Sequence, residues 1–238
     1  MVIKLKNNGI MIKNIERNNQ RAVILACSSL TDYIEAAQQK VGSSFPVTYL
    51  SRVYHRDPKE MRQHILEALQ TLKEQADVVL VAMGFCGGSW ENVEVPCTLV
   101  IPRIDDCVSL LLQVGDEPVS NLKEQGHLYV REKDPRRESF HAIFDKLTQD
   151  IDEETRKRYH QDWMKLYTHI DIMDTGLNNC RRAEYQAIVS EDADWLGARL
   201  SYVQGGTHLL EKLFSGNWDE QFLVLEPGSK TKKEQILI

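Results

Sequence analysis

The chain has 238 residues, of which 42% are hydrophobic and 27% are charged, a composition typical of a globular protein. Its net charge of -6 gives no positive field that would attract nucleic acid. No run reaches the roughly 18 apolar residues that a membrane helix needs, and the polar N-terminus lacks the apolar core of a signal peptide. We therefore expect a cytoplasmic protein whose five cysteines stay reduced and serve as thiols or ligands.

Short apolar runs alternate with segments of helical periodicity after a predicted N-terminal arm at 1–20. Strands are expected at 21–27, 46–50, 76–83, 98–101 and 127–130. Helices are expected at 31–40, 58–72 and 108–114. Continuous apolar strands separated by helices are typical of a parallel sheet that is covered on both faces. The sequence therefore predicts a Rossmann-like α/β half over 21–137.

The pattern resumes after a charged, strongly helical segment in the middle of the chain. The strands and helices expected there are 170–173, 182–194, 199–203, 207–214 and 221–225. They predict a helical connection and a second α/β half over 138–228, followed by a polar, mobile tail at 229–238. Two Rossmann-like halves around a cleft or one larger sheet would both fit this alternation.

Three of the five cysteines follow predicted strands, namely Cys27, Cys86 and Cys107. Open parallel sheets bind ligands beyond the carboxyl ends of their strands, so we expect these side chains on one rim. Cys27 and Cys107 also precede predicted helices, whose N-termini favour the thiolate. A buried cysteine often acts only as a small hydrophobe, but three of them on one rim favour a functional site.

Cys86 lies in a glycine-rich turn, in which Gly84, Gly87 and Gly88 allow backbone N–H groups to approach a ligand closely. We interpret these glycines as candidate cofactor-binding residues, together with Arg103, which could hold a carboxylate or phosphate. Neither a dinucleotide fingerprint nor a phosphate-binding loop is present.

Three converging thiolates would suit a soft transition metal or an iron–sulfur cluster, so Cys27, Cys86 and Cys107 are the candidate metal ligands. No C-x-x-C spacing occurs, which excludes a zinc ribbon or ferredoxin motif. The candidate catalytic residues are Cys86, His55 and Asp106. His55 could be a fourth ligand or a proton donor. Asp106 could act in acid–base chemistry, although capping of the following helix is the alternative.

These motifs resemble a known family of bacterial and archaeal proteins, the DUF1638 family. The resemblance rests on Ala26-Cys27, the His55 loop, Gly84-Phe85-Cys86-Gly87 and Ile101-Pro102-Arg103-x-x-Asp106-Cys107. It implies a companion of anaerobic one-carbon and corrinoid methyltransferase systems. On that basis the expected partners are a small-molecule ligand and a methyltransferase or corrinoid protein, through which a corrinoid would be reached.

Three functions follow from these observations. The first is a cysteine-ligated metal or iron–sulfur protein that assists anaerobic small-molecule metabolism, including methyl transfer. The second is a metal-free, racemase-like enzyme whose two thiols act as acid and base from opposite sides of a cleft. The third is a non-catalytic accessory subunit that binds a metal or a partner. Whether the chain is an enzyme stays open at this point.

Overall fold

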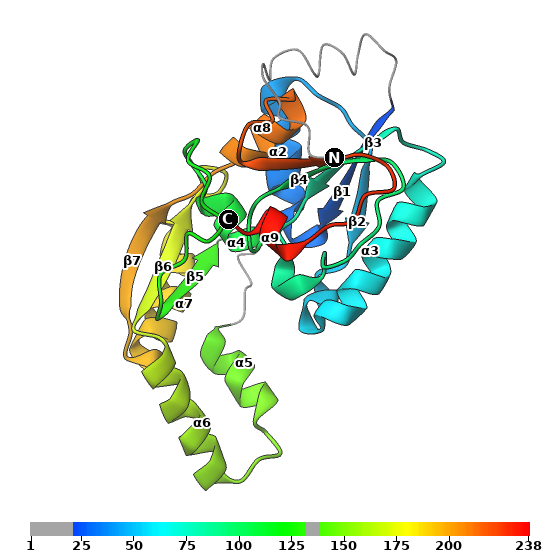
Figure 1. The fold of residues 1–238 in the computed structure, drawn as a ribbon. Helices are drawn as coiled ribbons and strands as arrows, with labels where there is room; N and C mark the ends of the chain where they lie inside the picture. Colours follow the sequence, from blue (N-terminus) through cyan, green and yellow to red (C-terminus); the bar gives the residue numbers. More distant parts are fainter. Residues whose placement is uncertain (1–20, 132–138) are drawn as a thin grey trace. The chain divides into compact units, whose positions relative to one another are not determined.

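The computed structural model describes residues 21–131 and 139–238, and the predicted arm at 1–20 lies outside them. The described chain forms two compact units, each with its own sheet (Figure 1). The first unit comprises the described residues up to Leu122 together with Thr207–Ile238, and the second comprises Lys123–Gly206. The predicted class, α/β with parallel sheets and flanking helices, is confirmed.

The first unit contains a five-stranded sheet in the order β2-β1-β3-β4-β8. Its strands are β1 (Ala22–Cys27), β2 (Val47–Leu50), β3 (Val78–Ala82), β4 (Thr98–Pro102) and β8 (Phe222–Leu225). The first four are parallel, and β8 pairs antiparallel with β4. Every residue of β1 and β3 is buried, which explains why their sequences are continuously apolar rather than alternating.

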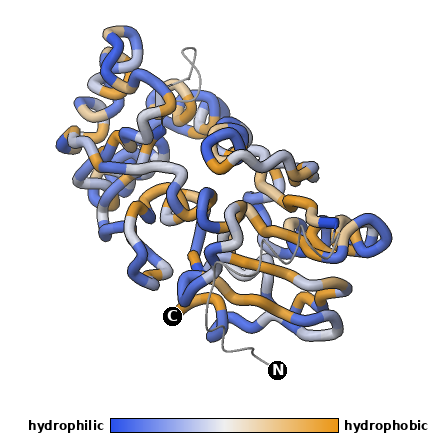
Figure 2. Tube along the Cα trace, turned by 90° about the horizontal axis from the view of Figure 1, so that it is seen from above, coloured by the Kyte–Doolittle hydropathy of each residue, from blue (hydrophilic) through white to orange (hydrophobic). Residues whose placement is uncertain are grey.

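The first unit contains five α-helices and three short 3-10 helices among its described residues. They are α2 (Thr31–Val41), α3 (Pro58–Leu72), α4 (Cys107–Leu112), α8 (His208–Ser215) and α9 (Lys233–Ile236), with short 3-10 helices η2 (Ser28–Leu30), η3 (Arg52–Arg56) and η4 (Cys86–Gly88). In α3, the Asp57 side chain caps the first turn and Pro58 takes the first helical position, where a missing N–H costs nothing. Hydrophilic and hydrophobic residues alternate along the coiled parts of the chain, as amphipathic helices require (Figure 2).

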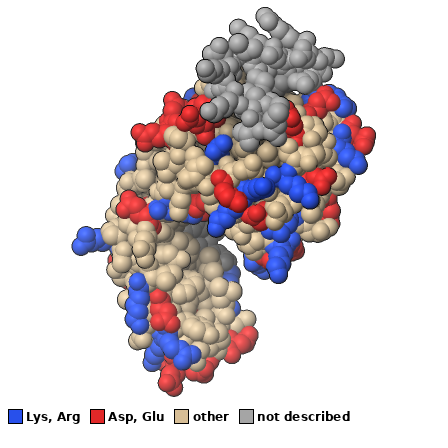
Figure 3. Space-filling model, in the orientation of Figure 1, with Lys and Arg blue, Asp and Glu red and all other residues tan. Residues whose placement is uncertain are grey.

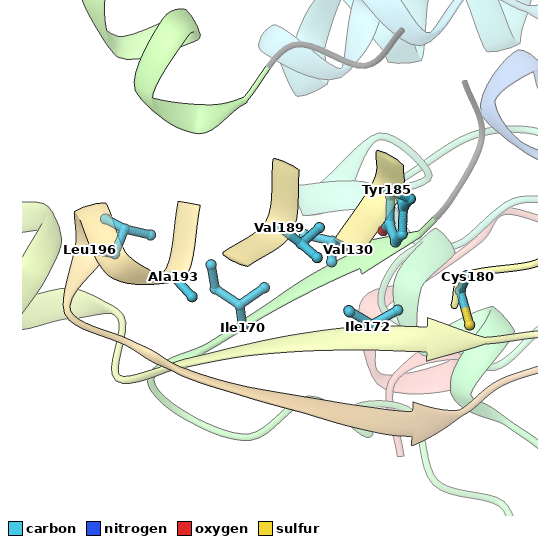
Figure 4. Packing of buried hydrophobic residues seen from close by; sticks show 8 residues of the cluster. All are labelled: Val130, Ile170, Ile172, Cys180, Tyr185, Val189, Ala193 and Leu196. Carbon is cyan, nitrogen blue, oxygen red and sulfur yellow. The ribbon is translucent and has the colours of Figure 1, made fainter. Parts of the chain in front are cut away.

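The second unit has a parallel three-stranded sheet in the order β5-β6-β7, formed by β5 (His127–Arg131), β6 (His169–Asp174) and β7 (Arg199–Gln204). Helix α7 (Ala183–Leu196) supplies Val189 and Leu196 to the core of this unit, and β6 supplies Ile170 and Ile172 (Figure 4). The charged, strongly helical segment predicted for the middle of the chain forms two helices, α5 (Phe140–Leu147) and α6 (Glu153–Leu166). Asp152 separates them because its side chain caps the start of α6.

The sequence predicted that the first half ends at residue 137, whereas the first unit ends at Leu122 and resumes at Thr207. The predicted strand at 127–130 begins the second unit, and the segment after Gly206 returns to the first. The return occurs because the apolar residues of β8 pair with β4, where Val224 lies opposite Val100. Whether two halves enclose a cleft stays a prediction.

The prediction of a mobile C-terminal tail was wrong. Thr231 and Ile236 are fully buried, and the end of the chain carries the short helix α9. The backbone N–H of Thr231 donates to the Val93 carbonyl at 3.0 Å, and its own carbonyl accepts from Asn92 at 3.0 Å. These hydrogen bonds order a segment whose polar composition alone suggested otherwise.

The surface of the described chain carries both signs of charge. Lysine and arginine side chains lie among aspartate and glutamate side chains on the face shown in Figure 3. Within the described ranges, no helix combines the length and the apolar character that crossing a membrane would require.

Candidate metal centre

The site lies at the carboxyl ends of three neighbouring parallel strands of the first unit. β1 ends at Cys27, η4 begins with Cys86 shortly after β3, and α4 begins with Cys107 shortly after β4. The chain extends the sheet to one side of β1 with β2 and to the other side with β3. Such a switch point opens a crevice beyond the strand ends, where doubly wound sheets bind ligands.

Cys27 is the fully buried cysteine of the site, with 0% of its surface exposed. Its sulfur lies 3.0 Å from the Ser29 hydroxyl and accepts the Ser29 backbone N–H at 3.4 Å. Because the chain turns into η2 at this point, that N–H is one of the groups a helix start leaves without an internal partner. The strand end therefore presents hydrogen-bond donors to a thiolate.

His55 reaches the same sulfur from the segment after β2. Its Nε2 lies 3.1 Å from Cys27 Sγ, and the residue is otherwise exposed. The Ser28 hydroxyl accepts the Arg52 backbone N–H at 3.0 Å, which ties η3 to the residue that follows Cys27. The neighbouring Tyr54 ring stacks on His64 of α3 with 3.7 Å between ring centroids. These contacts hold η3, and with it the imidazole, beside the end of β1.

Cys86 occupies a left-handed turn, which is uncommon for a residue with a side chain. Its φ is 48°, and Gly87 and Gly88 continue the turn at 66° and 100°. A side chain in this conformation costs about 1–2 kcal/mol, so other contacts must impose it. The Cys86 N–H donates to the Asp105 carbonyl at 2.6 Å, and the preceding Phe85 N–H donates to the Ile104 carbonyl at 2.9 Å. The segment after β4 therefore fixes the turn that carries Cys86.

Gly84 permits this close approach. A Cβ atom at position 84 would lie 2.5 Å from Cα, 2.6 Å from N and 2.7 Å from C of Asp106. Real Cβ atoms essentially never come so close to backbone, so only glycine fits without movement of one segment. Because Asp106 immediately precedes Cys107, the contact that needs Gly84 also brings the Cys86 turn to Cys107.

Asp106 sets the position of Cys107 by capping α4. One carboxylate oxygen of Asp106 accepts the backbone N–H groups of Val108 and Ser109, both at 2.9 Å. Cys107 is the first helical residue and is 8% exposed. Of the two interpretations of Asp106, the structure shows the capping one, and its acid–base role stays a prediction.

The pKa values of the four neighbouring side chains are shifted in different directions. The four are Cys27, His55, Cys86 and Cys107. The Cys107 thiol donates hydrogen bonds to the sulfurs of Cys27 and Cys86, and these bonds and burial raise the pKa of Cys107 well above 9.0. The bond from Cys107 lowers the pKa of Cys27 to about 4, with His55 and Ser29 helping against burial. The pKa of Cys86 falls to about 6 through its bonds with Cys107 and His55. Their thiolates raise the pKa of His55 to about 10.

A metal ion could be held by Cys27, His55 and Cys107. One donor atom from each lies within 4.8 Å of the other two. Around one tetrahedral ion bonded at 2.0–2.3 Å, neighbouring donor atoms are roughly 3.3–3.8 Å apart, so small side-chain movements would close the set. Two thiolates and an imidazole are soft and borderline donors, which match zinc, iron or another soft transition metal. The donor set therefore fits a metal in both spacing and chemistry.

Other residues predicted for the site have different surroundings. Arg103, directly after β4, is bonded to the start of β8, since its Nε donates to the Phe222 carbonyl at 3.3 Å and its backbone N–H donates to the preceding Gln221 carbonyl at 2.8 Å. Gly87 and Gly88 form the Cys86 turn, and the Gly88 carbonyl accepts a hydrogen bond from Arg62 at 2.7 Å. Their predicted ligand contacts remain untested.

Sequence reasoning missed three side chains that support the site, namely Ser28, Ser29 and Arg62. The two serines directly follow Cys27, and this adjacency was the available signal. Nothing local pointed to Arg62, because it reaches the Cys86 turn from α3. Cys97 and Cys180 are buried elsewhere in the chain, and Cys180 packs in the core of the second unit, which agrees with a structural role.

Comparison with known proteins identifies a family and no individual relative. The search of curated proteins and the search of solved structures returned no match. The family model described as "Protein of unknown function (DUF1638)" matches residues 49–214, which is well over half of the chain. The matched range contains His55, Cys86 and Cys107, while Cys27 precedes it. The resemblance inferred from the cysteine motifs is thereby confirmed, and the chain belongs to the DUF1638 family.

Proposed function

We propose that this protein binds a single soft transition-metal ion at Cys27, His55 and Cys107, with Cys86 as the fourth ligand, and uses it in small-molecule metabolism. The convergence of the first three donor atoms within 4.8 Å carries the proposal. Cys86 joins them through its hydrogen bonds with Cys107 and His55. A chain of this size buries a core without help from a metal, so an ion here would serve function rather than folding.

The spacing favours one ion over an iron–sulfur cluster. A cluster distributes its thiolate ligands over several iron atoms and so spreads them further apart than one ion does. Here the sulfurs of Cys27 and Cys107 lie within 4.8 Å of each other and of the imidazole nitrogen. Three sulfurs and one nitrogen in a tetrahedral arrangement suit zinc or ferrous iron best.

The grouping of the thiols also bears on the metal-free, racemase-like alternative. That chemistry needs two thiols on opposite sides of a substrate. Cys27, Cys86 and Cys107 instead all belong to the first unit, and Cys107 is hydrogen-bonded to both of the others. Such a group supports metal binding more than acid–base chemistry from two sides.

The family resemblance suggests where the ion would be used. We propose that the centre assists anaerobic one-carbon metabolism beside a methyltransferase or corrinoid protein. A thiolate-ligated ion can bind and polarise a small soft donor as a Lewis acid. His55 is exposed, and its Nε2 is hydrogen-bonded to Cys27 Sγ. As a ligand, it would therefore hold the ion close to solvent. A carrier that only binds the metal would use the same residues.

Metal analysis of protein purified without oxygen tests the proposal. We expect about one equivalent of zinc or iron per chain and no acid-labile sulfide. The ion should be absent from Cys27→Ser and Cys107→Ser and retained by Cys97→Ser, in which a buried cysteine outside the site is replaced. Iron with matching sulfide would show a cluster instead. Wild-type protein that binds neither metal, even when reconstituted, would refute the proposal.

A further inference from the structure

The four proposed ligands differ in how firmly the fold holds them. Cys27 ends a buried strand, and Cys107 begins a helix capped by Asp106. Cys86 instead lies in the left-handed turn that continues through Gly87 and Gly88. Among the described residues, the set of donor atoms within 4.8 Å of one another contains Cys27, His55 and Cys107 and not Cys86. Cys86 is therefore the outlying ligand.

Solvent also reaches the group from the side of Cys86. Cys27 and Cys107 are 0% and 8% exposed, whereas Cys86 is half-buried and both His55 and Gly87 are exposed. An incoming molecule would thus meet the turn that carries Cys86 before either of the buried segments that carry Cys27 and Cys107. Replacement of Cys86 would leave the other three donors in place.

One positively charged side chain, that of Arg62, contacts the turn that carries Cys86. Arg62 donates one guanidinium N–H to the Gly88 carbonyl at 2.7 Å, and its buried Nε has no hydrogen-bond partner within the described residues. Arg52 and Arg56 lie exposed in η3 on either side of His55 in the sequence. A guanidinium with an unused donor beside the turn favours an anionic ligand.

We propose that Cys86 is an exchangeable ligand and that a small anionic thiol, such as a mercapto acid, takes its place on the ion. This inference rests on the proposed function. In the exchange, the bond from the ion to Cys86 breaks and a bond to the incoming sulfur forms. The proton of the incoming thiol is released to solvent, and Cys86 leaves the ion as a thiolate. No oxidant or reductant is needed, and the carboxylate of the incoming molecule pairs with Arg62.

Cobalt(II) binding to cysteine variants tests the role of Cys86, because the intensity of its sulfur-to-metal absorption follows the number of bound sulfurs. Cys86→Ser should weaken cobalt affinity by no more than about tenfold, and Cys107→Ser by at least about a hundredfold. Cys97→Ser should bind as wild type does. Thermal unfolding of each metal-free variant separates loss of a ligand from loss of the fold.

Mercaptoacetate supplies the missing sulfur in the same experiment. Added to cobalt-loaded Cys86→Ser, it should restore the absorption lost with Cys86, whereas glycolate, which has oxygen in place of sulfur, should not. Arg62→Gln should weaken the apparent affinity for mercaptoacetate about fivefold and leave that for uncharged 2-mercaptoethanol unchanged. Lys59→Gln, an exposed substitution in the same helix, should alter neither affinity.

The unmodified protein gives an independent readout. In the metal-loaded wild type, mercaptoacetate should speed alkylation of Cys86 during a short iodoacetamide pulse, as read by mass spectrometry, without releasing the ion. If Cys86→Ser loses the ion as completely as Cys107→Ser, or if mercaptoacetate strips the ion from wild type, Cys86 is not exchangeable. These results would leave the proposed metal site standing, whereas wild-type protein that binds no metal would refute the proposed function itself.

Discussion

Replacing Gly84 by alanine tests whether the contact between the segments after β3 and β4 builds the site. The added Cβ would lie 2.5–2.7 Å from three backbone atoms of Asp106, and ordinary contact begins at 3.4 Å. One segment must therefore move by about 0.9 Å. Neither can do so easily, because the Phe85 and Cys86 N–H groups are bonded to the Ile104 and Asp105 carbonyls.

We expect Gly84→Ala to lower the free energy of unfolding by about 3 kcal/mol, the upper part of the range for overpacking of a tight interior. The displacement also separates Cys86 from Cys107, so metal affinity should fall. Gly115→Ala is the matched control, since nothing lies within 4 Å of its added Cβ. That variant should be neutral or stabilised by up to about 1 kcal/mol, because alanine restricts the unfolded chain.

Denaturant unfolding of the metal-free proteins and metal titration of the folded ones measure the two effects separately. If Gly84→Ala unfolds at the same denaturant concentration as Gly115→Ala and binds metal equally well, the close approach is not required. A loss of stability with unchanged metal affinity would show that the contact matters for the fold alone. Only the loss of both agrees with a site built by this contact.

Three further predictions concern the chemistry of the site. The pKa of Cys27 is lowered from 9.0 to about 4, so its stabilising contribution is complete above pH 9 and is lost as the pH falls through about 4. Between pH 6.5 and 4, His55 is charged in both the folded and the unfolded state. In this window, acidification should lower the free energy of unfolding of the metal-free wild type relative to Cys27→Ala by up to about 1.4 kcal/mol per pH unit. Denaturant unfolding at several pH values measures this difference. His55→Gln should raise the pH at which ultraviolet thiolate absorbance appears, since the imidazolium that lowers the pKa of Cys86 and Cys27 is gone; an unchanged titration would contradict the pairing. Ser29→Ala, which removes a hydrogen bond to Cys27, should weaken zinc affinity about tenfold in a chelator competition, and equal affinity would show that the hydroxyl does not orient the thiolate.

Much of the fold could be predicted because its signals are local. The apolar run ending at Cys27 appears as β1 one residue shorter than expected, and the Pro58–Leu72 periodicity is α3. The rule that ligands bind beyond strand ends then predicts that Cys27, Cys86 and Cys107 lie on one rim. Capping of α4 by Asp106 was also foreseeable, because aspartate before a helix commonly caps it.

What could not be predicted depends on contacts between distant residues. The sequence Phe222–Leu225 indicates a strand, but nothing in it says that the strand joins β4 in antiparallel pairing. His55 lies 28 residues from Cys27 and reaches it only because β2 lies beside β1. The left-handed conformation of Cys86 is imposed by carbonyls of another segment. Local patterns therefore identified the residues of the site, while the pairing of strands determined their geometry.

The protonation pattern explains how such a group of cysteines can remain folded without an ion. Three thiolates in one buried group would repel one another strongly. Cys107 avoids this by keeping its proton, since its pKa lies well above 9.0, and the protonated His55 offsets the charges of Cys27 and Cys86. In the proposed metal-bound state, the ion replaces the protons of Cys107 and His55 at the same atoms. The fold would then hold one donor set in two charge states, with protons and a metal ion competing for it.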